Sequence, residues 1–481
     1  MHPSQHRSSS NTPNSDGLRT VSDSFGSVSL PKGVLWGAQT ARSLQFFAIG
    51  EQRMPLEIIH ALALIKWAAA CVNGDLMLQK PLLARAIATA ANRVAAGEFD
   101  DEFPLSVWQT GSGTQSNMNV NEVIASLASQ DLVQGVDSDQ KTHPNDDVNL
   151  GQSSNDVFPT AMHLAVGLKV KTTLLPALDE LMSALAAKAL EFESIIKIGR
   201  THLQDATPIT FAQEFGGYCA QLQLCQQSLL SSMDVVYRLA IGGTAVGTGL
   251  NTHPDFGQRV ASVLASRLGI PFAQADNLFA AMAGHEALVA FHGALKMLAV
   301  ALTKIANDIR LMGSGPRAGL GELILPQNEP GSSIMPGKVN PTQVEALTMV
   351  CAQVMGHDAA IGFAASQGQF ELNVHKPLIA LNTLDSLRLL ADAMHSFTRH
   401  CVSGLVVNQT RADELLQSSL MLVTALVPHI GYERAAKIAK QAQANNCTLR
   451  EAALASKAVT AAQFDQWVDP SKMLSPSTKK A

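Results

Sequence analysis

The chain has 481 residues, 46% of them hydrophobic and only 16% charged, which is enough apolar surface for more than one domain. This composition excludes an intrinsically disordered protein. The formal net charge is −5 at pH 7 and no basic stripe occurs, so no nucleic acid is expected as a partner. Aromatic residues make up only 5% of the chain, a balance that favours helices over strands.

The sequence shows no targeting or membrane signal. The first 20 residues are polar, contain two prolines and lack the apolar stretch of a signal peptide, so residues 1–20 are expected to form a disordered tail. The most apolar run, residues 287–302, is interrupted by His292 and Lys296, so no membrane span is expected.

The six cysteines are scattered along the chain, without a C-x-x-C pair, and no histidine cluster has zinc spacing. We therefore expect reduced thiols, a cytoplasmic location and no metal site. No G-x-G-x-x-G motif follows a strand and no Walker loop is present, so no cofactor is expected.

In chain order, residues 21–152 are expected to form an N-terminal domain of mixed and helical structure. Turn and short strand signals come first, and residues 56–98 follow as helices. Residues 153–408 are expected to form a central bundle of long helices, and residues 409–481 a smaller helical domain.

Two features define the central bundle. Residues 160–192 are helical in pattern, with a kink or break expected at Pro176. Apolar residues then recur at alternating spacings of three and four between Leu288 and Met312, a stripe suited to near-parallel helix packing. The predicted fold class is therefore mainly α.

A polar loop, "GSSIMPGKVNP" at residues 331–341, precedes one of these helices. Asn340 is expected to cap the helix with Pro341 in its first position, so that free N–H groups and the positive end of the dipole face the loop. Lys338 adds a full charge, and Ser332 and Ser333 add hydroxyls. The loop is thus either an anion site or a solvated loop with a surface lysine.

Other polar segments carry neutral donors suited to carboxylate oxygens, although helix capping explains each one singly. These donors are Ser112, Thr114, Ser153, Ser154, Asn155 and Thr201. His202 lies in "GRTHLQDATP" and is an acid–base candidate. His143, Asn145 and Asp146 could form a metal or anion cluster, or only a turn.

These blocks resemble the iron-independent class II fumarases of the fumarase/aspartase superfamily. The resemblance rests on "GSSIMPGKVNP", "SGTQSNMNVNEV", "QSSNDVFPTAMH" and "GRTHLQDATP", and extends from about residue 25 to the end. It implies a lyase of the tricarboxylic acid cycle that adds water reversibly to fumarate in the anti sense, giving (S)-malate. It also implies a homotetramer with a core of about 20 helices and active sites shared by three subunits.

The resemblance further implies roles for the loop residues. Ser332 matches the base that takes a carbon-bound proton, and Lys338 and Asn340 match groups that stabilise the aci-carboxylate intermediate. His202, paired with Glu345, matches the other acid–base residue, and which of Ser332 and His202 handles which proton stays open. The neutral donors would bind the substrate carboxylates together with Ser333. The group His143, Asn145 and Asp146 matches a second carboxylate site.

Two alternatives remain beside hydration of fumarate. One is aspartate ammonia-lyase activity on the same scaffold, although "MPGKVNP" and "QSSND" favour a fumarase. The other is a structural or binding protein that keeps the fold without turnover.

Overall fold

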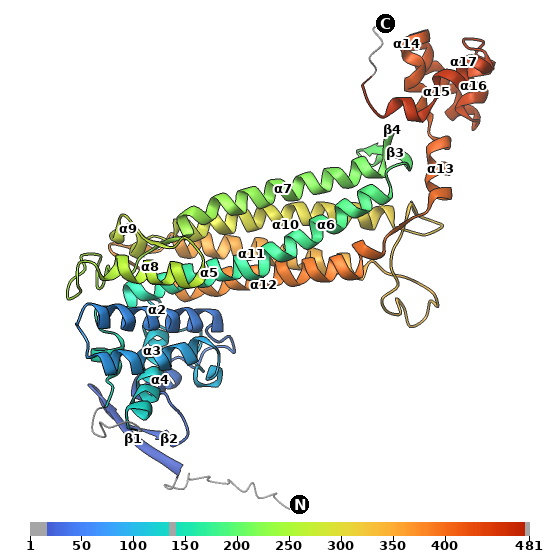
Figure 1. The fold of residues 1–481 in the computed structure, drawn as a ribbon. Coiled ribbons are helices and arrows are strands. Elements are labelled where there is room, and N and C mark those ends of the chain that lie inside the picture. The colour runs from blue at the N-terminus through green and yellow to red at the C-terminus, as the bar shows by residue number, and fades with distance from the viewer. Residues whose placement is uncertain (1–16, 134–140, 477–481) are drawn as a thin grey trace, which may run out of the picture. The chain divides into compact units, whose positions relative to one another are not determined.

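The computed structural model describes residues 17–133 and 141–476 and is mainly helical, with seventeen α-helices in those residues (Figure 1). The chain forms two compact units, each built from three segments. Of the described residues, the first unit contains those up to 171 together with 231–293 and 356–386. The second contains 172–230, 294–355 and the described residues from 387 to 476.

The first unit begins with a two-stranded antiparallel hairpin of β1 (Leu18–Asp23) and β2 (Gly26–Pro31), in which Leu18 pairs with Pro31. Residues 18–20, expected to belong to the tail, are therefore in a strand, because pairing with β2 satisfies their backbone. Residues 1–16 of that expected tail lie outside the described residues. Helix α1 (Ala38–Phe46) follows.

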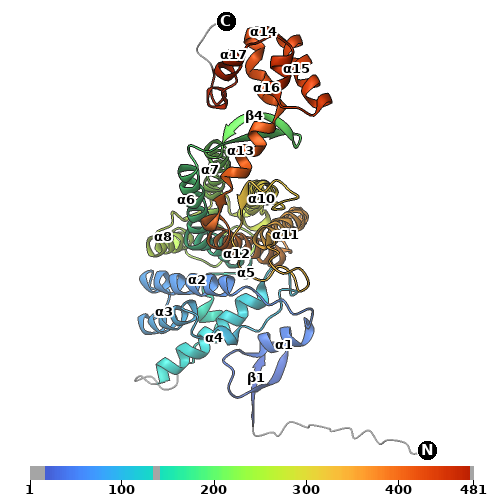
Figure 2. The same cartoon turned by 90° about the vertical axis from the view of Figure 1, so that its right-hand side faces the viewer.

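Helices α2 (Leu56–Asp75), α3 (Pro81–Ala95) and α4 (Thr114–Val133) pack against one another (Figure 2). The helices expected over residues 56–98 are therefore present. Helix α2 is apolar on all its faces and buries residues along its whole length, as expected of a helix surrounded by protein. Its one buried lysine, Lys66, is fully enclosed.

The remaining elements of the first unit are short, apart from α5 and α8. They are η2 (Asp100–Glu102), η3 (Pro144–Val148), α5 (Ser154–Lys169), β5 (Arg238–Leu239), α8 (Phe256–Leu268), β6 (Ala273–Gln274), α9 (Leu278–Ala283), β8 (Gly368–Gln369) and β9 (Leu372–Asn373). Strands β5 and β6 pair in parallel, and β8 and β9 pair antiparallel.

Four long helices contribute residues to both units. They are α7 (Phe211–Val236), α10 (Glu286–Met312), α11 (Thr342–Ala365) and α12 (Lys376–His400). The apolar stripe predicted between Leu288 and Met312 is buried throughout, which confirms the pattern in α10. At Pro176, where a kink or break is expected, the helix is not interrupted: a π-helical segment, η4 (Val170–Leu174), leads directly into α6 (Leu175–Glu191).

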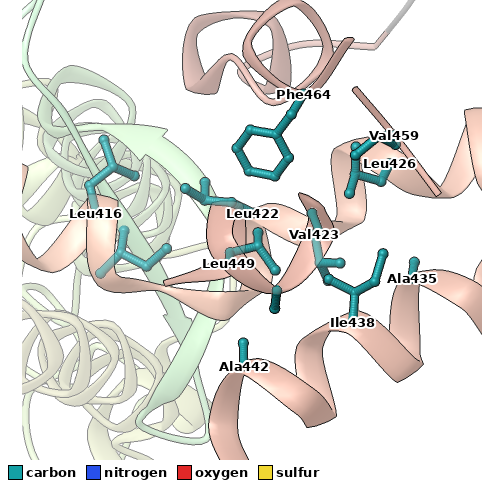
Figure 3. Packing of buried hydrophobic residues seen from close by; sticks show 13 residues of the cluster. Leu416, Leu422, Val423, Leu426, Ala435, Ile438, Ala442, Leu449, Val459 and Phe464 are labelled. Carbon is teal, nitrogen blue, oxygen red and sulfur yellow. The ribbon is translucent and has the colours of Figure 1, made fainter. Parts of the chain in front are cut away.

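The second unit contains two antiparallel strand pairs, β3 (Ile196–Thr201) with β4 (Gln204–Thr210), and β7 (Leu323–Ile324) with β10 (Val406–Val407). Its C-terminal part is a cluster of short helices. They are η5 (Val402–Gly404), α13 (Gln409–Ser418), η6 (Leu420–Leu426), α14 (Val427–Ile430), α15 (Tyr432–Asn445), α16 (Leu449–Ala455), α17 (Ala461–Trp467) and η7 (Pro470–Met473). Leu422, Ile438 and Phe464 belong to one buried apolar cluster there (Figure 3).

Two helices, α2 and α10, are long and apolar enough to cross a membrane by length and composition alone. In the most apolar window of α2, 72% of the residues are buried inside the protein, and in that of α10 56% are buried. Core helices of proteins without a membrane span pass the same test.

Candidate active site

Three hydroxyl groups at two helix N-termini of the first unit are joined by hydrogen bonds, and we call Ser112, Thr114 and Ser154 the hydroxyl cluster. Thr114 is the first residue of α4, and its Oγ1 lies 2.8 Å from Ser112 Oγ and 2.7 Å from Ser154 Oγ. Ser154 is the first residue of α5. Two positive helix ends and three neutral donors therefore meet at one place, which suits the oxygens of a carboxylate.

The loop that carries Ser112 approaches its neighbours so closely that glycine is required on both sides. A Cβ on Gly111 would lie 1.4 Å from the carbonyl oxygen of Val374. A Cβ on Gly113, where φ is +78°, would lie 2.2 Å from the ring of Phe158. The glycines thus fix the path of the backbone at this hydroxyl cluster.

Ser153 and Asn155 are oriented by helix α5. The Ser153 side chain accepts a hydrogen bond from Asn155 N in a capping box, so capping is one role of this serine. Asn155 Nδ2 donates to the carbonyl oxygen of Ala245 at 2.9 Å. Both residues remain partly exposed.

His143, Asn145 and Asp146 lie together at the start of η3, a short π-helical segment, where the sequence left open a turn or an ion-binding cluster. His143 caps η3, and its Nδ1 accepts a hydrogen bond from Asp146 N at 3.1 Å. Asn145 and Asp146 also line a cavity of about 510 Å³, and Ser153 lies in the same lining. The turn therefore adjoins the segment that leads to the hydroxyl cluster. Within residues 17–133 and 141–476, no group of three or more His, Cys, Asp and Glu could hold a metal.

In the second unit, His202 lies at the tip of the β3–β4 hairpin, in the segment that the sequence indicated only as a polar interruption between helices (Figure 1). Thr201 pairs with Gln204, so His202 and Leu203 form a two-residue turn with φ of +57° and +61°. Such turns normally contain Asn or Gly, and two larger side chains here store backbone strain. His202 and Thr201 are both exposed.

A buried charge network holds the base of this hairpin. Arg200 donates through both terminal nitrogens to Glu322, at 2.7 and 3.0 Å, and the Glu322 side chain is fully buried. Lys197 donates to Glu214 at 2.6 Å and lies 3.8 Å from Glu322. The paired charges fix the strand that ends at Thr201.

The loop at residues 331–341 is held at its base and exposed at its tip. Asn340 Nδ2 donates to the carbonyl oxygen of Gly331 at 2.6 Å, closing the loop. Ser332 Oγ accepts hydrogen bonds from the backbone amides of Ile334 at 3.3 Å and Met335 at 3.1 Å. Ser333 and Lys338 are exposed.

The expected capping by Asn340 is wrong. Helix α11 begins at Thr342, and the first carbonyl to accept a helical hydrogen bond is that of Pro341, from Glu345 N. Proline supplies no capping side chain, and the Asn340 amide is used across the loop instead. Glu345 lies in the first turn of α11, and among the described residues no hydrogen bond or ion pair joins it to His202.

The candidate residues fall into two groups. The first unit contains the hydroxyl cluster, its neighbours Ser153 and Asn155, and residues 143–146. The second unit contains the hairpin and the loop 331–341.

The sequence pattern did not single out two buried charges of the first unit, Lys66 and Asp156. The capping-box spacing of Ser153 and Asp156 was the signal that could have drawn attention to the aspartate.

Comparison with known proteins gives a consistent result. A family model described as Lyase matches residues 26–356, and one described as Fumarase C C-terminus matches residues 422–475. A protein of Chromobacterium violaceum named fumarate hydratase class II is 59% identical over 95% of this chain and 99% of its own length. One of the same name from Methylorubrum extorquens is 59% identical over 96% and 98%.

Among solved structures, the recombinant class II fumarase from Schistosoma mansoni superposes with a TM-score of 0.92 at 46% identity. The match covers 95% of this chain and 99% of that one. A structure titled fumarate lyase:delta crystallin from Brucella melitensis, bound to cobalt, gives a TM-score of 0.90 at 41% identity over 95% and 100%. The chain therefore belongs to the class II fumarate hydratase family of lyases.

Proposed function

We propose that this protein is a fumarate hydratase that adds water reversibly to fumarate in the anti sense and yields (S)-malate. The observation that supports this most directly is the environment of Ser332. A serine hydroxyl is a weak base unless its alkoxide is stabilised, and two backbone amides already donate to this oxygen. The exposed Lys338 ammonium on the same loop adds positive charge.

In the malate direction, Ser332 would remove the proton from the carbon next to a carboxylate. The electrons then move onto that carboxylate, and the aci-carboxylate dianion needs donors placed where the charge develops. Lys338, Asn340 and the N-terminus of α11 are the groups proposed for this task. His202 of one subunit, oriented by Glu345 of another subunit and acting through a water molecule, would protonate the leaving hydroxyl.

The substrate carboxylates would be bound by the hydroxyl cluster of Ser112, Thr114 and Ser154. Ser153, Asn155, Thr201 and Ser333 are proposed to complete the binding groups. The turn with His143, Asn145 and Asp146 would bind a second carboxylate outside the reaction centre. Its position beside the 510 Å³ cavity, which Ser153 also lines, supports this assignment.

The chain is further proposed to act as a homotetramer in which three subunits form each active site. The candidate residues are divided between two units of the chain, and large apolar side chains stand exposed on the long helices. These side chains are Leu224, Leu230, Val300, Met349 and Phe363.

Mixing Ser332→Ala with Ser154→Ala protein, each inactive alone, should restore turnover in hybrid assemblies. No recovery after proven subunit exchange would contradict the shared site.

The test of the activity follows the absorbance of the fumarate double bond when malate or aspartate is supplied separately. A signal with malate supports hydration, whereas a signal with aspartate alone would establish an ammonia-lyase. No signal with either substrate would leave a protein that keeps the fold without turnover.

We also propose a cytoplasmic location, which is consistent with six free cysteines.

A further inference from the structure

A lysine lies fully buried in α2, beneath the segment that carries the candidate carboxylate-binding residues. Lys66 Nζ donates to Asn149 Oδ1 at 2.7 Å and to Gln152 Oε1 at 3.0 Å. Asn149 Oδ1 also accepts from Asn117 and Asn121 of α4, each at 3.3 Å. The ammonium thus ties the turn at residues 149–152 to two helices of the first unit.

An aspartate of opposite charge holds the other end of the same segment. Asp156, fully buried in the first turn of α5, accepts a hydrogen bond from Ser153 N at 2.9 Å through Oδ1. Its Oδ2 accepts from Gly242 N and Thr244 N, each at 3.0 Å. One carboxylate therefore joins the start of α5 to the loop that also receives the Asn155 side chain at Ala245.

Burying the charges of Lys66 and Asp156 costs folding free energy, which argues against a purely structural role for them. Burial lowers the pKa of Lys66 to about 7 and raises the pKa of Asp156 to about 6. Well-packed apolar residues in place of buried charges often leave a protein equally or more stable. In the part of the chain that the structure describes, the hydrogen bonds of these two side chains go to residues 149–153 and 242–244.

We propose that Lys66 and Asp156 are positioning residues, which fix residues 149–156 so that Ser153, Ser154 and Asn155 are aligned to bind a dicarboxylate. The proposal rests on the proposed function, because the dicarboxylate is the substrate of that reaction. Lys66 also anchors the segment directly after the turn with Asn145 and Asp146. The same pair therefore sets the spacing between the two candidate carboxylate sites.

The test compares Asp156→Asn and Lys66→Met with the wild type. Steady-state measurements give KM and kcat for fumarate, and calorimetry gives the Kd of succinate, a dicarboxylate that cannot react. We expect KM and the succinate Kd to rise together by roughly ten-fold or more, because each variant removes hydrogen bonds that hold the segment of residues 149–156 in place. The matched control is Thr160→Val, one turn further along α5, where a buried hydroxyl donates only to the Asp156 carbonyl.

The outcomes separate positioning from stability. A structural role alone would lower the melting temperature and the amount of active enzyme, as expected for Thr160→Val, and leave KM and Kd unchanged. Values within two-fold of the wild type in both variants would overturn the proposal. If Asp156→Asn does not fold, Lys66→Met decides alone. If the wild type binds succinate but hydrates no fumarate, the proposed function fails while the succinate Kd still tests the positioning.

Discussion

Replacing Glu322 with glutamine should destabilise the hairpin that presents His202. The substitution keeps the side-chain volume but removes the negative charge that pairs with Arg200 and lies near Lys197. The Arg200 side chain is 15% exposed and that of Lys197 is 3% exposed. Breaking a buried pair leaves uncompensated charge and costs about 3–5 kcal/mol of unfolding free energy. Glu214 still pairs with Lys197, so the loss falls mainly on Arg200.

The matched control is Asp465→Asn, which breaks the pair between Arg450 and Asp465. These side chains are 47% and 57% exposed, so the same loss of charge should cost about 0–1 kcal/mol. Urea unfolding measures both changes, with every protein at one concentration because the proposed assembly would add to stability. Turnover should fall with Glu322→Gln and not with Asp465→Asn. Equal losses of stability in the two variants would refute the assignment of the hairpin to a buried charge network.

Three further predictions concern single residues. Ser332→Ala should lower kcat by at least about a hundred-fold while the succinate Kd changes little, and retained turnover would remove Ser332 as the base. Lys338→Met should lower kcat/KM for malate by about a hundred-fold or more, and an unchanged value would remove its electrophilic role. Burial lowers the pKa of Lys66 from 10.5 to about 7, so its stabilising contribution is present at high pH and lost as the pH falls toward 7. The difference in unfolding free energy between the wild type and Lys66→Met should therefore rise by about 1.4 kcal/mol per pH unit between pH 7.5 and 9.5. A difference that does not change with pH would contradict the lowered pKa of Lys66.

The features that the sequence predicted best are those set by local periodicity. The stripe from Leu288 to Met312 is buried because one helix repeats the same spacing, and no distant residue is needed to recognise it. The π-helical segment before Pro176 is likewise a local feature, since proline lacks the N–H that would continue the regular hydrogen-bond ladder.

The hairpin at His202 was missed for the opposite reason. Its turn uses His202 and Leu203 at positive φ, where a sequence pattern expects Asn or Gly. Strand pairing between Thr201 and Gln204 is stabilised instead by Glu322, more than 100 positions along the chain. A strained turn of this kind persists only where tertiary contacts enforce it, so sequence alone indicated only a polar segment.

Lys66 and Asp156 could not be recognised for a related reason. A single lysine in an apolar helix has the pattern of a side chain that extends to the surface, and an aspartate three residues after a serine has the pattern of an ordinary cap. Their burial depends on the turn at residues 149–152 and on the loop at residues 242–244. Only the folded chain brings these segments together.

The two kinds of candidate residue differ in how firmly they are held. The candidate carboxylate-binding groups of the first unit lie at the starts of helices and are held by buried charges, so little conformational entropy would be lost on binding a ligand. The loop with Ser332 is closed at its base by the hydrogen bond from Asn340, whereas its tip is open to solvent, with Ile334 83% exposed and Met335 47% exposed. A base that must reach a carbon-bound proton after the substrate has entered needs such freedom, whereas groups that select a dicarboxylate need the opposite. The proposed function therefore places recognition of the dicarboxylate on a preorganised scaffold and proton transfer on the exposed loop.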